Sequence, residues 1–230
     1  MKRHATLLMS LCLVFSWAHA QDQPPEKRRP IGTCTAAPTG EGWVDLLDAD
    51  HVNEWREPKE NRDIFAVEDG VLSIPGNRPF GYVGYMKEEF GDFQLHIEFK
   101  VTERTNSGVI FRAGPEDPPF SGMEIQVYDD HGAEPSRTSS GSVFDVATPM
   151  FNMSLPRGEW NSFDITCKGD SLVVLMNGWK ILDIDLSKMT MPIGKFDTPY
   201  AELPKKGFLF VQDHGHPVWY RNIFLKKLQD

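Results

Sequence analysis

Short runs in which apolar and polar residues alternate constrain the fold of this 230-residue chain more than any other feature. Across residues 93–101 every second side chain is apolar, which is typical of a strand with one face in the core. Asn177-Gly178, a dipeptide typical of tight hairpins, separates two more such runs. No segment shows a sustained apolar period of 3.6 residues, so the sequence predicts an all-β sandwich or jelly roll. The predicted strands are residues 64–67, 71–74, 93–101, 106–112, 123–129, 171–176, 179–184, 208–211 and 218–225.

The first twenty residues have the pattern of a secretory signal peptide. Lys2 and Arg3 precede an apolar run at residues 7–17, and Ala-His-Ala at residues 18–20 fits the small-x-small cleavage rule. A membrane anchor is the alternative, but the run is shorter than the roughly 20 residues that span a bilayer. We therefore expect residues 1–20 to be a signal peptide and the protein to be secreted or periplasmic.

The rest of the chain divides into an arm and one domain. Residues 21–41 are rich in Pro, Gly, Thr and charge, which predicts a flexible N-terminal arm. Strand signals then continue without a break in composition, so residues 42–230 are predicted to form a single domain. Cys34 and Cys167 remain after signal cleavage. In an oxidising compartment they could form a disulfide, and two free thiols are equally compatible with the sequence.

The charge of the chain narrows the classes of partner. Its formal net charge is −9, from 24 Lys and Arg against 33 Asp and Glu. A nucleic-acid binder needs a basic patch that displaces counterions from phosphates, and an anionic membrane surface also attracts basic segments. We therefore expect neither nucleic acid nor an anionic membrane surface as the partner.

Residues 123–129 form the most informative predicted strand. Its apolar side chains alternate with Glu124, Gln126 and Tyr128, so an acid, an amide and a phenol should share the opposite face. Such a row suits recognition of a polar ligand. A solvated face of an antiparallel strand has the same pattern, and periodicity alone favours that simpler interpretation.

The predicted strand at residues 106–112 contains an apolar run that ends at Arg112. An arginine in that position is expected to bind an oxygen-rich ligand or to form a structural salt bridge, and the sequence does not choose between them. Gly108 has no side chain and would let a ligand approach the sheet closely.

Metal sites are permitted by the sequence without being required by it. His214 and His216 would share a face if their strand continued, but Gly215 and Pro217 indicate a turn, and two further ligands are not apparent. A single histidine there could also act as an acid or base. A calcium site is common in jelly rolls, and the acidic loop residues at positions 129–130 and 183–185 would allow one.

Eight segments along the chain form a recognisable series. The most informative are Asn-Ser-Gly-Val-Ile-Phe-Arg at 106–112, Gly-Met-Glu-Ile-Gln-Val-Tyr-Asp at 122–129 and Gln-Asp-His-Gly at 212–215. The others are residues 42–48, 67–72, 90–95, 159–161 with 177–178, and 220–223. In this order they resemble the motifs of the 3-keto-disaccharide hydrolase domain family of bacteria. The likeness covers roughly residues 42–228. Two departures are Asp48-Ala49, where the family usually has a glycine, and a long loop at residues 192–206.

The resemblance implies a concanavalin A-like jelly roll of two antiparallel sheets, with a sugar site on its concave face. It also implies cleavage of glycosides that are already oxidised at C3. The ketone acidifies the proton on C2, so a base can remove it, the enolate can expel the glycosidic oxygen, and water can add to the product. An ordinary glycosidase would instead need two carboxylates flanking one bond.

Site residues follow from this chemistry. Glu124 or His214 is expected to be the general base or acid, and Arg112 is expected to stabilise the enolate oxygen. Sugar hydroxyls are expected to bind to Asn106, Gln126, Asp129 and, as a weaker candidate, Arg221.

The competing hypothesis is a non-catalytic carbohydrate-binding module on the same sandwich, because sandwich folds host both kinds of protein. Such a module would stack sugars on exposed aromatic side chains, for which Tyr82, Tyr128 and Trp219 are candidates.

Overall fold

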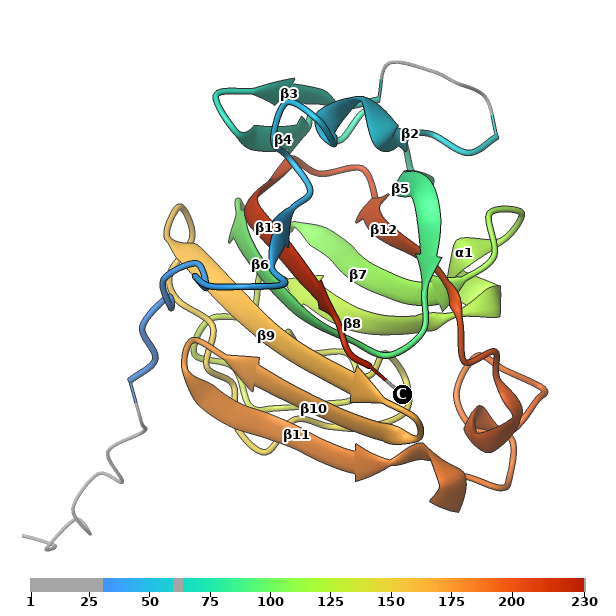
Figure 1. The fold of residues 1–230 in the computed structure, drawn as a ribbon. Coiled ribbons are helices and arrows are strands. Elements are labelled where there is room, and N and C mark those ends of the chain that lie inside the picture. Colours follow the sequence, from blue (N-terminus) through green and yellow to red (C-terminus); the bar gives the residue numbers. More distant parts are fainter. Residues whose placement is uncertain (1–30, 60–63, 230) are drawn as a thin grey trace, which may run out of the picture. The chain divides into compact units, whose positions relative to one another are not determined.

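A computed structural model describes residues 31–59 and 64–229 of the chain. Two antiparallel sheets pack face to face, as Figure 1 shows. Within the described residues the larger sheet has eight strands, and β1 pairs with β13 beside the main path. Its order is β11 (Trp179–Asp185), β10 (Ser171–Met176), β9 (Trp160–Lys168), β6 (Phe93–Val101), β13 (Val218–Lys227), β4 (Val71–Ile74) and β3 (Ala66–Glu68), with β1 at Val44–Asp45.

The smaller sheet has five strands over the same described residues. Its order is β2 (Trp55–Arg56), β5 (Gly81–Phe90), β12 (Gly207–Asp213), β7 (Asn106–Ala113) and β8 (Met123–Tyr128). Short helical turns lie in the connections: η1 (Val52–Glu54), α1 (Pro118–Ser121), η2 (Leu186–Lys188) and η3 (Tyr200–Glu202). No helix among the described residues is long and apolar enough to cross a membrane.

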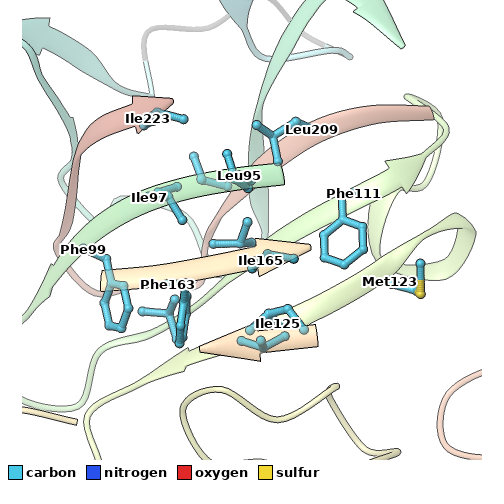
Figure 2. Close-up of a cluster of buried hydrophobic side chains, with 14 of the residues drawn as sticks. Leu95, Ile97, Phe99, Phe111, Met123, Ile125, Phe163, Ile165, Leu209 and Ile223 are labelled. Atoms are coloured by element: carbon cyan, nitrogen blue, oxygen red, sulfur yellow. The ribbon is translucent and has the colours of Figure 1, made fainter. Parts of the chain in front are cut away.

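The core lies between the sheets and follows directly from the alternation in the sequence. Every second residue of β6 points inward, and the inward residues of β7, β8 and β12 meet them from the opposite sheet (Figure 2). Phe93 and Phe111 contact edge to face across the two layers, with ring centroids 5.4 Å apart. Removal of this apolar surface from water is the main force that holds the sheets together. The labelled core residues are Leu95, Ile97, Phe99, Phe111, Met123, Ile125, Phe163, Ile165, Leu209 and Ile223.

The predicted strands agree closely with the structure, but β1, β2, β5 and β9 are missing from the prediction. Strands at residues 71–74, 93–101 and 171–176 have the predicted bounds. Strand β5 was not predicted, because glycines at its start and the charged run at residues 87–89 interrupt the alternation. Gly84 in this strand allows close packing, because a Cβ there would overlap the Phe210 ring of the neighbouring strand.

The predicted signal peptide at residues 1–20 lies outside the described residues, but the second half of the predicted flexible arm is described and is bound to the sheet. The Thr33 amide donates to the Asn177 carbonyl at 3.1 Å. The Thr35 amide donates to Ser162 Oγ at 2.9 Å, and the Thr35 hydroxyl donates to Asp164 at 3.0 Å. Residues 31–41 therefore belong to the folded domain rather than to a free linker.

The two cysteines are free thiols on opposite faces of the larger sheet. Cys167 belongs to the core between the sheets. Cys34 lies on the other side, near Ser162 and Glu98, and burial raises the pKa of its thiol to about 11. A sheet separates the two sulfur atoms, so the disulfide that the sequence allowed does not form in this structure.

Candidate functional site

The outer face of the smaller sheet gathers polar side chains that are nevertheless buried. On β8, Ile125 and Val127 point into the core, so Glu124 and Gln126 point outward, as the alternation predicts. Both outward side chains are almost fully buried. Burying a carboxylate and an amide away from water is costly unless partners compensate. The contacts of these two groups therefore define the candidate site.

Strand register aligns two rows of side chains across this face. One row contains Glu124 opposite Ile110, with Phe210 on the next strand. The parallel row contains Gln126 opposite Gly108 and continues with Gln212 on β12, which is paired with Tyr82 on β5.

Tyr82 contributes a hydroxyl group to this row. It forms a hydrogen bond with Gln212, while burial raises the pKa of the Tyr82 phenol to about 12. A phenol with this pKa stays protonated at neutral pH and can donate a hydrogen bond.

Gly108 makes room for the Glu124 carboxylate. A Cβ atom at position 108 would overlap Glu124 Oε1 and crowd the rest of that carboxyl group. The carboxylate therefore lies flat over β7, in space that any other residue type would fill. The sequence predicted that Gly108 would admit a ligand, and the structure places the site's own carboxylate there.

Lys195 is the partner of Glu124, and it comes from the long loop at residues 189–199. Its Nζ lies 2.7 Å from Glu124 Oε2, and the two side chains are only 10% and 5% exposed. Rings of Phe120, Phe144 and Phe196 surround the ammonium with centroids 5.5–5.9 Å away. An ion pair enclosed in this way interacts more strongly than one in water, because the surrounding dielectric is low.

Seven buried side-chain polar atoms in the described part of the chain have no hydrogen-bond partner. Two of them, Gln126 Oε1 and the Tyr200 hydroxyl, belong to the surroundings of Glu124. Gln126 uses its Nε2 to donate to Asn106 Oδ1 at 3.0 Å, so its carbonyl oxygen remains available. Burial and the nearby charge of Glu124 raise the pKa of Tyr200, which therefore remains a neutral donor. Unpaired buried polar groups are rare in folded proteins and often mark the place of a ligand or water.

A pocket of about 440 Å³ adjoins this cluster. Tyr82 and Phe120 line it, and Phe120 also flanks Lys195, so the pocket and the ion pair share a wall. Phe80 forms another wall and contacts the His214 ring edge to face at 4.6 Å. Apolar walls with a few polar groups are typical of small-molecule sites.

Arg112 does not join the cluster that the sequence predicted for it. The backbone at Arg112 has φ of 52°, which breaks the alternation of β7. Ala113 therefore takes the outward position in its place. The Arg112 side chain donates to Asp92 Oδ1 and to the carbonyls of Gly91 and Gly169, each at 2.9 Å. Arg112 therefore has a structural role, in which it joins two turns. The expectation that it would lie with Glu124 and Gln126 is wrong.

Asp129 is held by structural contacts as well. Arg157 Nε lies 2.8 Å from both carboxylate oxygens, and the Arg104 amide donates to the same group at 2.8 Å. These bonds occupy the carboxylate that was expected to hold a sugar hydroxyl. Asn106, in contrast, lies beside Gln126 and keeps its place in the candidate site.

Arg221 lies on the outer face of the other sheet. Its Nε lies 2.7 Å from Glu98 Oε2, and Asn222 donates to Glu98 Oε1 at 2.6 Å. The two side chains reach one carboxylate because β13 bulges here, with φ of 49° at Asn222. The Arg221 guanidinium also stacks on Trp160 at 4.1 Å. Arg221 is therefore separated from Glu124 by both layers of the sandwich.

The same outer face contains a buried histidine. His96 Nδ1 lies 2.6 Å from Asp164 Oδ1, and His96 Nε2 lies 3.7 Å from Glu98 Oε1. Burial would lower the pKa of His96, but the bond to Asp164 and the nearby Glu98 carboxylate outweigh it and raise that pKa to about 9. Burial would raise the pKa of Glu98, but the nearby His96 imidazole and the bonds from Asn222 and Arg221 lower it to about 2. We call these residues, with Asp164, the His96–Glu98 network.

The histidines after β12 remain near the pocket without forming a metal site. Across residues 31–59 and 64–229, no group of three or more His, Cys, Asp or Glu side chains is placed to hold a metal ion. Asp213, beside His214, is fully buried, and its burial raises the pKa of its carboxyl group. The acidic loop residues that would allow a calcium site bind groups of the protein instead. Asp130 accepts a hydrogen bond from the Ser140 amide, and Asp183 accepts one from Lys180.

Sequence reasoning missed Lys195 and Tyr200 as site residues. Both lie in or beside an irregular loop, where no periodicity indicates which way a side chain points. The long loop at residues 192–206, which contains both, was noted as a departure from the family's usual pattern. Tyr82 was considered for sugar stacking, and the structure places it between the pocket and Gln212.

Comparison with known proteins now assigns the chain to a family. Residues 42–226 match the 3-keto-alpha-glucoside-1,2-lyase-like domain. The chain belongs to this family. Its membership confirms the resemblance found in the sequence and the prediction of a glycoside-hydrolase-like enzyme.

Individual relatives agree with this assignment. A 3-keto-disaccharide hydrolase of Bacteroides thetaiotaomicron is 25% identical over 82% of this chain and 79% of its own length. A solved structure from Parabacteroides distasonis, provisionally named a glycosyl hydrolase, is 29% identical, with a TM-score of 0.71 over 81% of this chain and 99% of that one. A Bacillus subtilis protein with a galectin-like fold, at 13% identity and a TM-score of 0.54, covers 86% of this chain and 97% of its own and shows the fold alone. The predicted concanavalin A-like sandwich is confirmed.

Proposed function

We propose that this protein is an exported enzyme that cleaves 3-keto-glycosides, including 3-keto-disaccharides, by elimination and hydration. The observation that carries the proposal is the buried Glu124–Lys195 pair beside two unpaired polar groups. Membership of a family described as 3-keto-alpha-glucoside-1,2-lyase-like supports this chemistry, as does a relative named 3-keto-disaccharide hydrolase.

Glu124 is the proposed general base. Its carboxylate would take the proton from C2 of the sugar, leaving an enolate whose negative charge lies on the former keto oxygen. The C1–O bond then breaks, and the departing oxygen takes a proton. Water adds across the C1–C2 double bond and gives the free 3-keto sugar, so the net reaction is hydrolysis. A positioned base of this kind typically contributes 10²–10⁴-fold to the rate.

Lys195 replaces Arg112 as the proposed group at the keto oxygen. Its ammonium lies beside the base and is enclosed by aromatic rings, so it can stabilise a developing negative charge where water is excluded. The neutral Tyr200 phenol, without a partner among the described side chains, can donate to the same oxygen. Gln126 Oε1 and Asn106 are proposed to bind sugar hydroxyls.

His214 is the proposed acid for the leaving group. It packs against Phe80, a wall of the pocket that adjoins the ion pair. Histidine is the side chain best suited to exchange protons near neutral pH, so an imidazole in this place can supply one.

The direct test compares a 3-keto-glucoside with its unoxidised parent, each with and without EDTA, and follows release of the leaving group. We expect release from the keto form alone. Release from both substrates would indicate an ordinary glycosidase. Release from neither, with sugar binding still detectable by calorimetry, would favour a binding module. Loss of activity in EDTA would add a metal to the mechanism. Lys195→Met should lower kcat by roughly 10²-fold, because one donor to the oxyanion is lost.

Export is the second part of the proposal, and it rests on the pattern at residues 1–20. N-terminal sequencing of the protein recovered from the periplasm or medium should begin at Gln21. A mature protein that retains Met1 inside the cell would contradict it.

A further inference from the structure

We propose that the pocket between Phe80 and Phe120 binds the leaving group of the glycoside and selects an uncharged leaving group with a flat apolar face. This inference rests on the proposed function, because it names the part of the substrate that each half of the site holds. The supporting observations are the shared wall at Phe120, the difference in exposure between the two halves, and the charge at the rim of the pocket.

The pocket is continuous with the proposed reaction centre. Phe120 lies 5.9 Å from Lys195 Nζ and also lines the pocket. Tyr82 lines the pocket too, and Glu124 is close enough for its charge to affect the Tyr82 phenol. A substrate bound with its C2 proton at Glu124 would therefore extend past Phe120 into this space.

Exposure differs sharply between the two halves. The side chains of Lys195 and Glu124 are 10% and 5% exposed, whereas Phe80 and Phe120 are 67% and 59% exposed. The ring that loses its proton needs the dry half, because the enolate is stabilised where water is excluded. The leaving group must depart after the bond breaks, so the open half suits it.

The chemistry of the pocket favours one class of leaving group. Two phenyl rings offer apolar faces on which a sugar ring or an aromatic ring can pack. Glu57 and Asp117 line the same space, with Lys59 as the cation among the described lining residues. The Asp117 carboxylate, whose charge reaches Tyr82 in the same pocket, disfavours an anionic leaving group such as a uronate. The volume of about 440 Å³ lies within the range of small-molecule sites.

The test uses 3-keto-glucosides that carry methanol, glucose or glucuronic acid as the leaving group. For Phe80→Ala we expect the kcat/KM ratio of the glucose-bearing to the methyl substrate to fall about tenfold, mainly through KM. Phe120→Ala should act in the same direction, although its contact with Lys195 can add an effect on kcat. Phe151→Ala is the matched control, because Phe151 is an exposed phenylalanine, at 43%, outside the pocket.

A second arm tests the charge of the rim. Asp117→Asn should raise kcat/KM several-fold for the glucuronate-bearing substrate relative to the glucose-bearing one. Thermal unfolding of each variant checks that the fold is retained, and Phe80, being mostly exposed, should tolerate truncation.

The outcomes separate the two proposals. If the wild-type protein releases methanol from the keto-glucoside but Phe80→Ala leaves the substrate ratio at its wild-type value, the pocket assignment is wrong and the proposed function stands. The pocket assignment is also wrong if Phe80→Ala lowers kcat/KM equally for the methyl and glucose substrates. If the wild-type protein cleaves none of the keto substrates, the proposed function fails, and this inference fails with it.

Discussion

The outer faces of the two sheets each bury ionised side chains, but they satisfy them differently. On the larger sheet, the His96–Glu98 network pairs each carboxylate with several donors, and residues 31–41 bind beside it through Thr35. On the smaller sheet, Glu124 has Lys195 as its close charged partner, and neighbouring polar atoms of Gln126 and Tyr200 stay unpaired within the described residues. His96 Nε2 in the network also lacks a hydrogen-bond partner among the described residues, but the Glu98 carboxylate lies 3.7 Å from it.

This difference separates structure from function better than burial or charge does. A buried carboxylate surrounded by donors is anchored, and its bonds hold strands and the N-terminal segment in place. A buried carboxylate beside unpaired donors and acceptors is suited to catalysis, because a bound ligand can form hydrogen bonds with those unpaired groups. Arg112 and Arg221 illustrate the first case, since both were expected at the site and both are consumed by structural contacts.

The largest effect should come from Glu124→Gln, which removes the proposed base and preserves the shape of the side chain. We expect kcat to fall by roughly 10³-fold, within the range for loss of a general base. The measurement is leaving-group release from a 3-keto-glucoside, with circular dichroism to check folding. Activity close to the wild-type value would show that Glu124 is not the base. The contrast between a functional smaller sheet and a structural larger sheet would then be wrong.

Glu98→Gln, the same change on the opposite face, should affect stability instead. Breaking one partner of a buried ionic network leaves other charges uncompensated, and we expect about 3 kcal/mol lower free energy of unfolding. Urea denaturation followed by tryptophan fluorescence measures it. The kcat of the folded protein should stay within twofold of wild type. A large loss of kcat with unchanged stability would show that this face, too, is functional.

Gly108→Ala should displace the Glu124 carboxylate without dismantling the sheet. The added methyl group would meet the end of a side chain, which can move, rather than backbone. We expect roughly tenfold lower kcat, because a misplaced base transfers protons poorly. Gly91→Ala is the control, since a Cβ there meets the Lys205 carbonyl at an ordinary 3.5 Å. Equal activity in the two variants would show that the carboxylate does not need its position over β7.

The pH dependence of stability gives the smallest and most specific effect. The pKa of His96 is raised to about 9. Its contribution to the free energy of unfolding is therefore fully present below about pH 6.5 and is lost as the pH rises through 9. The pKa of Glu98, lowered to about 2, makes its contribution complete above about pH 4.5 and lost as pH falls through 2. Two further charged groups face this pair: Asp164 contacts His96, and Arg221 contacts Glu98.

Urea unfolding at several pH values tests this window. The free energy of unfolding of the wild-type protein should decrease on both sides of pH 4.5–6.5, and Glu98→Gln should flatten the acidic side. The exposed Glu68→Gln should keep the wild-type profile. A profile that Glu98→Gln leaves unchanged would mean that other groups set the pH dependence.

Much of the fold could be predicted because strands have a period of two. That period placed β6, β7 and β8 correctly and put Glu124 and Gln126 together on an outward face. It failed at Arg112, because one residue with positive φ shifts the alternation and turns the side chain away. The pairing of Glu124 with Lys195 could not be predicted, because the lysine lies 71 residues farther along the chain in a loop without periodicity.

The origin of Lys195 in a loop has a consequence for how this scaffold can diversify. The base is fixed to a hydrogen-bonded strand, while its cationic partner is carried by residues 189–199, which lie outside the strands. Randomising the exposed positions of that loop and position 195 would therefore sample new electrophilic groups while the carboxylate stays on its strand. A gene library confined to these codons is a compact starting point for selecting altered glycoside preference.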